Sequence, residues 1–165
     1  MTARHRRLTT DLGVYLIAAE GSALTGVWRE GQKHFPRPER LGRETPGPDD
    51  LLDAASEQLL AYLRGERTDW DLPLAPEGTA FQHAVWEQLQ RIPRGATTTY
   101  GAIARTLGRP GAAQAVGRAV GSNPLSIVVP CHRVLSTQGT LTGYAGGVGT
   151  KRELLRLEGV DVSGA

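Results

Sequence analysis

The sequence of 165 residues is poor in cysteine, in aromatic residues and in long apolar runs. Its single cysteine excludes an internal disulfide and any zinc site built from several cysteines. No stretch approaches the roughly 18 apolar residues of a membrane-spanning helix. The basic start MTARHRR is followed by a segment too short and too polar for a secretory signal. We therefore expect a cytoplasmic protein without membrane association, large enough to bury a core without disulfides or metals.

Acidic residues are scarce in the second half of the chain. Residues 1–78 hold 10 basic and 13 acidic residues, whereas residues 79–165 hold 9 and 4, so the two balances are −3 and +5. A basic half is typical of proteins that bind a polyanion. Ordinary surface charge also explains a balance of this size, so charge alone does not decide between the two.

The segment DWDLPLAPEGTAF separates two regions, and we place a domain boundary at 75/76. In the first region, GVYLIAAE and ALTGVWRE predict two strands joined by a hairpin turn at EGS, where Gly21 supplies conformational freedom. Residues 32–48, rich in proline, glycine and charge, predict a loop. PDDLLDAASEQLLAYLRGE then predicts a helix, because Leu52, Ala55, Leu59, Tyr62 and Leu63 recur at helical spacing.

The second region predicts a helix followed by a helix-turn-helix. TAFQHAVWEQLQRIP has the capping-box pair Thr79 and Gln82 before an apolar face. In TTTYGAIARTLGRPGAAQAVGRAVGSNP, a first helix capped by Thr99 precedes a GRPG turn and a second helix at about 111–121. Gln114 and Arg118 are its long polar residues and share one face. Such a unit either packs against a neighbouring helix or lies in a DNA groove.

These patterns together predict a mixed α/β (α+β) fold with two domains. Residues 1–75 form a small N-terminal scaffold domain of sheet and helix. Residues 76–165 form a mostly helical C-terminal domain with a winged or helix-turn-helix unit and an active-site loop.

The only thiol lies in IVVPCHRVL, directly before His132. A cysteine beside proline is often a small buried hydrophobe. As a nucleophile, a thiol of ordinary pKa near ~8.5 requires a base or a positive field, which His132 and Arg133 could supply. Because neighbours on an extended chain point to opposite faces, His132 would act through a water or a bent backbone. Glu158, on the last predicted helix VGTKRELLRLEG, either orients His132 or is a solvated charge.

Three segments resemble one known family. NPLSIVVPCHRVL, with TTYGAIA before it and TGYAGGVGTKRELLRLEG after it, closely resembles the O6-alkylguanine-DNA alkyltransferases, also called methylated-DNA–protein-cysteine methyltransferases. The resemblance covers roughly residues 79–159, and the Pro-Cys-His-Arg tetrapeptide preceded by Asn-Pro is highly specific. It implies DNA repair by direct reversal: the damaged base is flipped out, and its alkyl group moves irreversibly to Cys131 in a single turnover. The implied substrate is O6-alkylguanine in duplex DNA, with O4-alkylthymine as a further candidate.

The resemblance also implies the roles of individual residues. Cys131 is the alkyl acceptor, His132 the water-linked base and Glu158 the acid that orients it. Asn123 braces the active-site turn, and Tyr100 donates to the flipped base. Further residues are implied as the substrate pocket, namely Ser126, Val134, Tyr144, Ala145 and Lys151. The implied DNA contacts come from Thr99, Ala112, Ala113, Gln114, Gly117, Arg118, Arg133 and Thr137. The family implies no cofactor and a monomer that binds double-stranded DNA, with cooperative binding left open.

Two positions depart from the family pattern. Gln114 stands where the family usually has the arginine that fills the space of the flipped base, so we expect slower base extrusion. Ser126 stands where some relatives carry a second proline, which puts bulky alkyl groups in doubt more than methyl. Some relatives also carry a structural zinc, but His5 and His34 have no cysteine partner, so we expect no metal.

Three other classes of protein remain as alternatives. An alkyltransferase-like sensor binds damaged DNA without transfer, but such relatives lack the acceptor cysteine. A helix-turn-helix transcription factor would read bases, although the second helix has only two long polar side chains. A cysteine hydrolase using Cys131 and His132 would show repeated turnover.

Overall fold

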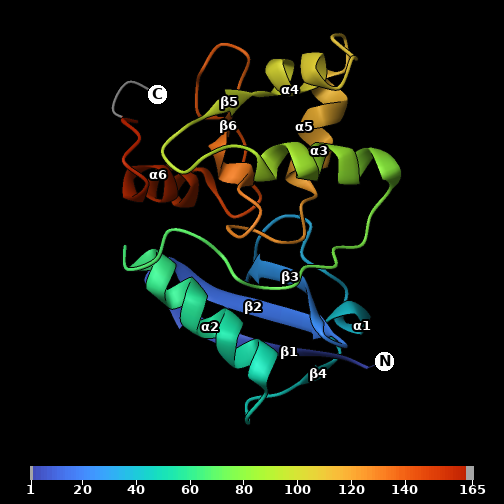
Figure 1. Cartoon of the computed structure of the whole chain (residues 1–165), viewed down its shortest axis with the longest axis vertical. Helices are drawn as coiled ribbons and strands as arrows, with labels where there is room; N and C mark the ends of the chain where they lie inside the picture. Colours follow the sequence, from blue (N-terminus) through green and yellow to red (C-terminus); the bar gives the residue numbers. More distant parts are fainter. Residues whose placement is uncertain (1, 163–165) are drawn as a thin grey trace. The chain divides into compact units, whose positions relative to one another are not determined.

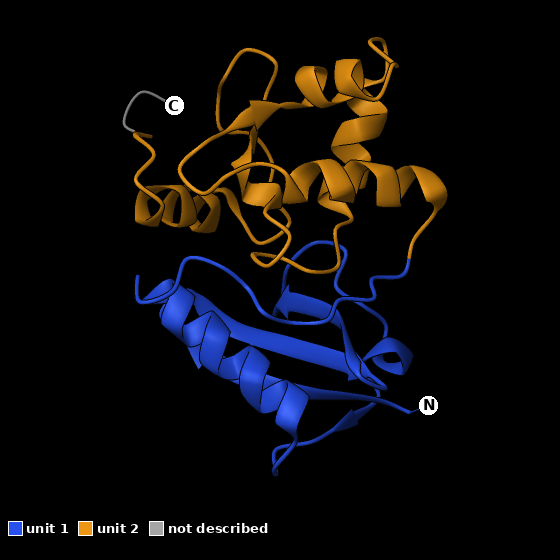
Figure 2. Cartoon of the chain, viewed as in Figure 1, with its two compact units in different colours: residues 1–77 blue, residues 78–165 orange. Residues whose placement is uncertain are grey.

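The computed structural model describes residues 2–162, and the chain divides into two compact units, residues 1–77 and 78–165 (Figure 2). The division lies close to the boundary at 75/76 expected from the composition. Both units combine helices with short or longer strands, which confirms the mixed α/β (α+β) class.

Unit 1 is a four-stranded sheet with a helix across one face (Figure 1). The strand order is β3–β2–β1–β4; the first three strands are antiparallel neighbours, and β4 runs parallel to β1. The elements are β1 (Ala3–Thr10), β2 (Gly13–Glu20), β3 (Ala23–Arg29), α1 (Pro38–Leu41), β4 (Arg43–Glu44) and α2 (Asp50–Leu63).

The hairpin and the helix of unit 1 are confirmed. β2 and β3 pair around a tight turn in which Gly21 has a φ of +60°. On α2, Leu52, Ala55, Leu59 and Tyr62 are buried, as the helical spacing predicts. The aspartate that precedes α2 caps it, because the Asp49 carboxylate accepts a hydrogen bond from the third helical N–H at 3.0 Å.

The sequence analysis missed β1 and treated residues 32–48 as a loop, whereas that segment contains α1 and β4. β1 lacks an apolar alternation because its arginines reach the start of α2: Arg4 pairs with Asp49, and Arg6 pairs with Asp53. Ion pairs rather than apolar contacts therefore attach this strand to the helix.

Unit 2 is built mainly from helices. Its elements are α3 (Ala80–Gln90), β5 (Thr98–Thr99), α4 (Tyr100–Thr106), α5 (Ala113–Gly121), a 3-10 turn (Cys131–Arg133), β6 (Val134–Leu135) and α6 (Val148–Leu157). β5 and β6 pair in parallel, with Thr98 beside Val134. This pairing brings the start of α4 next to the end of the turn that carries the thiol.

The helix-turn-helix and the capping box are confirmed. Thr79 and Gln82 exchange both hydrogen bonds of the box, at 3.1 and 2.8 Å. The Thr99 hydroxyl caps α4 by accepting from Ala102 N–H at 3.1 Å. The second helix begins at residue 113 rather than 111. Because the Trp86 indole donates to the Ala119 carbonyl at 2.8 Å, α3 is fixed against the inner side of α5.

Candidate active site

The turn before the thiol is closed by one side chain. Asn123 Nδ2 donates to the Val129 carbonyl at 2.9 Å, and its Oδ1 accepts from Leu125 N–H at 3.0 Å. Inside this turn Ile127 has a φ of +74°, a left-handed conformation that a β-branched residue rarely adopts. Ile127 is fully buried, so its surroundings and the Asn123 bonds hold the strained backbone in place.

Cys131 begins the 3-10 turn directly after Pro130 and is 6% exposed. The backbone is therefore bent at this point, which is one of the two routes by which His132 was expected to reach the thiol. Burial raises the pKa of the Cys131 thiol, against opposing effects of a hydrogen bond from Asn123 and the positive charge of Lys151. The resting form is a protonated thiol, so its use as a nucleophile requires a proton acceptor.

His132 and Glu158 form a buried pair. The His132 Nε2 atom lies 2.9 Å from Glu158 Oε2, and both side chains are fully buried. Burial, with the positive charges of Arg133 and Lys151, lowers the pKa of His132 well below its ordinary value. The imidazole ring is therefore neutral. An ionised Glu158 carboxylate accepts a hydrogen bond, so the ring hydrogen is placed on Nε2. Nδ1 is buried and has no hydrogen-bond partner among residues 2–162, so it is an available acceptor.

Arg133 corrects an expectation drawn from the resemblance. It was assigned to DNA contact, but it is 7% exposed and its guanidinium points inward. Its Nε and Nη2 each donate to Glu158 at 2.8 Å, and Nη1 donates to the Ile92 carbonyl at 2.7 Å. A guanidinium engaged in this way is not available to a DNA phosphate.

Lys151 supplies the positive charge that the sequence analysis sought in His132 and Arg133. Its side chain is fully buried, and Nζ donates to the carbonyls of Val134 at 2.6 Å and Thr142 at 3.2 Å. Burial lowers the pKa of Lys151 to about 8, while the nearby Cys131 acts to raise it. The lysine thus joins α6 to β6 and to the glycine-rich loop, next to the thiol. The resemblance assigned Lys151 to the substrate pocket, but the local sequence does not indicate its effect on the thiol, since 20 positions separate Lys151 from Cys131.

The residues assigned to DNA contact divide by exposure. Gln114 and Arg118 are exposed on one face of α5, and Thr137 is exposed. Gly117 is half-buried, and a methyl group added there would lie 3.8 Å from the Tyr100 ring. Thr99, Ala112 and Ala113 lie at the starts of α4 and α5.

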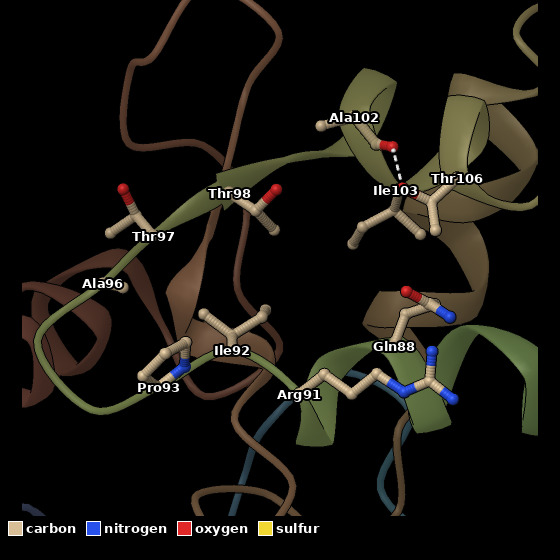
Figure 3. A pocket seen from close by; sticks show the side chains of 10 residues that line it. All are labelled: Gln88, Arg91, Ile92, Pro93, Ala96, Thr97, Thr98, Ala102, Ile103 and Thr106. Atoms are coloured by element: carbon tan, nitrogen blue, oxygen red, sulfur yellow. Dashed lines mark hydrogen bonds between the residues drawn. The ribbon is translucent and has the colours of Figure 1, made fainter.

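The residues assigned to the substrate pocket line neither of two surface pockets in unit 2. Ser126, Val134 and Lys151 are buried, and Tyr144 and Ala145 are half-buried. One pocket, of about 260 Å³, lies between α3 and α4, with Ile92 and Ile103 pointing into it from opposite sides (Figure 3). The other, of about 240 Å³, lies between Phe81 and Arg109. Neither includes the thiol, its histidine or its carboxylate.

Two features are absent from residues 2–162. No three His, Cys, Asp or Glu side chains are grouped so that they could hold a metal ion. No helix in this part of the chain is long and apolar enough to cross a bilayer.

A helix-turn-helix beside a buried Cys–His–Glu arrangement defines the class of a DNA-binding unit that carries a nucleophilic thiol. Comparison with known proteins agrees. The sequence model of the 6-O-methylguanine DNA methyltransferase DNA-binding domain matches residues 80–160. The chain belongs to the methylated-DNA–protein-cysteine methyltransferase family.

The similar proteins cover nearly the whole chain. The Mycobacterium tuberculosis methylated-DNA–protein-cysteine methyltransferase is 45% identical over 93% of this chain and 91% of its own length. The Shigella flexneri protein of the same name is 52% identical over 93% of this chain and 94% of its own length. The crystal structure of Mycobacterium tuberculosis OGT in complex with DNA has a TM-score of 0.84 at 44% identity, covering 94% of this chain and 92% of that one.

Proposed function

We propose that this protein repairs DNA by direct reversal, moving the methyl group of O6-methylguanine onto Cys131. One observation carries the proposal: the buried thiol is followed by a neutral histidine whose Nδ1 is an available acceptor and whose Nε2 faces Glu158 at 2.9 Å. This is the arrangement of nucleophile, base and orienting acid. Membership in the methyltransferase family supports the choice of substrate.

The protein's own side chains account for every proton and bond in the proposed transfer. The thiol proton passes to His132 Nδ1, through a water, and the thiolate sulfur forms a bond to the methyl carbon. The bond between that carbon and O6 breaks, and its electron pair enters the guanine ring. The Tyr100 hydroxyl gives the proton that completes guanine and is reprotonated from His132 through solvent. The products are S-methylcysteine and guanine, so no cofactor is required.

The helix-turn-helix delivers the base. α5 carries mostly small residues, which favour close approach to a groove, and its exposed Gln114 and Arg118 face one side. Removing a base from the stack costs about a few kcal/mol, which contacts made by the flipped base must offset. In this proposal Gln114 fills the space left in the duplex, and Tyr100, beside Gly117, faces the flipped guanine.

The proposal includes three finer points. The thioether is stable, so each molecule reacts once. The protein acts as a monomer on double-stranded DNA. O4-alkylthymine is a second substrate, because the same displacement at a methyl carbon applies to it.

The test is intact mass and peptide mapping after incubation with duplex DNA that contains one O6-methylguanine. We expect the Cys131 peptide to gain one methylene's mass and the reaction to stop at one equivalent. The variant Cys131→Ala should gain nothing while keeping its affinity for the duplex. Tight binding of the lesion by the unaltered protein without any gain in mass would make it a sensor instead. Release of many product molecules per protein would indicate a hydrolase.

A further inference from the structure

We propose that Arg133 is a positioning residue for methyl transfer: it keeps the Glu158 carboxylate ionised and oriented, so that His132 presents Nδ1 to the thiol proton. This inference rests on the proposed function. It gives Arg133 a task inside the protein in place of the DNA contact expected from the resemblance.

The hydrogen bonds around Glu158 favour an ionised carboxylate. Glu158 Oε1 accepts from Arg133 Nε, while Oε2 accepts from Arg133 Nη2 and faces His132 Nε2. A carboxylate accepts all of these contacts, whereas a protonated carboxyl gives up part of its acceptor capacity. The two-point guanidinium contact therefore favours the ionised form.

The arginine is itself held from the other side. Its Nη1 donates to the Ile92 carbonyl at 2.7 Å, just beyond the end of α3, and its side chain is 8% exposed. The fork geometry of guanidinium makes this three-point attachment specific to arginine. Arg133 thereby fixes the orientation of Glu158, which sits at the end of α6, relative to the turn that carries the thiol.

The ionised carboxylate decides where the imidazole carries its hydrogen. With an ionised Glu158 the hydrogen of neutral His132 stays on Nε2, and Nδ1 remains an acceptor. If Glu158 were protonated, it would donate to Nε2, and the imidazole hydrogen would move to Nδ1. The thiol proton would then have no acceptor on this ring.

Burial and neighbouring charges also shift the pKa values of Glu158, Arg133 and His132. Burial raises the pKa of Glu158 to about 8 in the folded protein. The two hydrogen bonds from Arg133 favour the ionised carboxylate despite this burial. Burial and the charge of Arg94 lower the pKa of Arg133 to about 10, so the guanidinium stays charged at neutral pH. The positive charge of Lys151 acts to lower the pKa of both His132 and Cys131.

The first experiment compares methyl-transfer rates of Arg133→Met and unaltered protein from pH 6.5 to 9, as a ratio that cancels the ionisation of the thiol itself. At pH 7 we expect a loss of about 10²-fold, the contribution of a positioned base. The ratio should recover toward the high end of this pH range, where Glu158 ionises without its partner. Arg133→Lys, which keeps the charge, should lose less activity and show a flat ratio. A flat ratio for Arg133→Met would overturn the inference.

Two controls separate positioning from general damage. Arg156→Met removes an exposed arginine of α6 that pairs with Glu153, and it should leave the rate and the pH profile unchanged. Adding Glu158→Gln to Arg133→Met should abolish the recovery at high pH, because the titrating group is gone. Recovery that persists in this double variant would show that another group titrates and would also overturn the inference.

The second experiment needs no variant, so it holds even if Arg133→Met does not fold. Long-range proton–nitrogen NMR of the unaltered protein at pH 7 reports which His132 nitrogen carries the hydrogen. We expect Nε2–H, and Nδ1–H would overturn the inference. Failure of the unaltered protein to take up a methyl group would instead overturn the proposed function, and the NMR result would stand independently of it.

Discussion

His132 is a histidine that the fold keeps neutral, and this should make stability depend on pH. Its pKa is well below the ordinary value of 6.5 in the folded protein and returns to it on unfolding. Below about pH 6.5 the unfolded chain binds a proton that the folded one does not, so stability is full above this pH and falls as the pH falls. The slope from this one group approaches about 1.4 kcal/mol per pH unit.

Urea unfolding between pH 7.5 and 5.5 measures this slope, and His132→Gln should lack it. The same measurement examines Glu158. If that carboxyl were protonated in the folded protein at neutral pH, folding would take up a proton where His132 excludes one. Stability would then rise or stay level as the pH falls, which would contradict the ionised state of the carboxylate.

The roles of single residues were predictable from sequence where a motif identified them. They were not predictable where the fold buries a residue that is usually exposed. Cys131 and His132 stand out because the thiol is unique and the histidine adjoins it. Arg133 was misplaced because the resemblance assigned it to DNA contact, and arginine is mostly an exposed residue. Its acceptor Glu158 lies 25 positions away, and nothing in the local sequence indicates that the two meet.

At the scale of elements, the small residues of α5 suit close approach to DNA, but the helix has few long side chains that could contact it. Only Gln114 and Arg118 are long polar residues on its exposed face, and Val116, Ala119 and Val120 are buried beneath. A glutamine is shorter than arginine and stacks less well, so it stabilises an extruded base less. We therefore expect this helix to limit how fast the lesion reaches the thiol.

Gln114→Arg should raise the rate of methyl transfer from duplex DNA by about tenfold, equivalent to ~1.4 kcal/mol of the unstacking cost. The matched control is O6-methylguanine nucleoside, which needs no extrusion and should react at an unchanged rate. Single-turnover kinetics with both substrates measure the effect. An unchanged duplex rate would mean that base extrusion does not limit the reaction, or that Arg118 already supplies the missing contact.

Elements were predictable where apolar spacing and end signals agreed. The capping box at Thr79 and the apolar face of α2 placed two helices correctly, since both signals are local. β1 was missed because its inner contacts are ion pairs from Arg4 and Arg6 to acidic residues at the start of α2. β4 consists of two residues and forms only by pairing with β1, so no pattern of its own exists in the sequence.

At the scale of the whole molecule, the excess of basic residues lies in unit 2 and is displayed mainly by exposed arginines. Residues 79–165 hold 9 basic against 4 acidic residues. Arg133 and Lys151 are buried and contribute nothing to an external partner. The exposed set comprises Arg91, Arg105, Arg109 and Arg118. Arg156 is also exposed, but it pairs with Glu153 on its own helix. Phosphate contacts of such residues release counterions from DNA, so binding should be steeply salt-dependent.

We expect affinity for undamaged duplex DNA to fall linearly in a logarithmic plot against NaCl concentration, as measured by fluorescence anisotropy. Arg118→Ala should lower the slope by about 0.9, the value for one phosphate contact, and Arg156→Ala should not change it. Methyl transfer from the free nucleoside should be indifferent to salt, because Cys131, His132 and Glu158 are buried and poorly screened. If salt slowed the nucleoside reaction as much as duplex binding, it would be acting on the buried groups themselves. The separation of an external basic surface from an internal charged network would then be wrong.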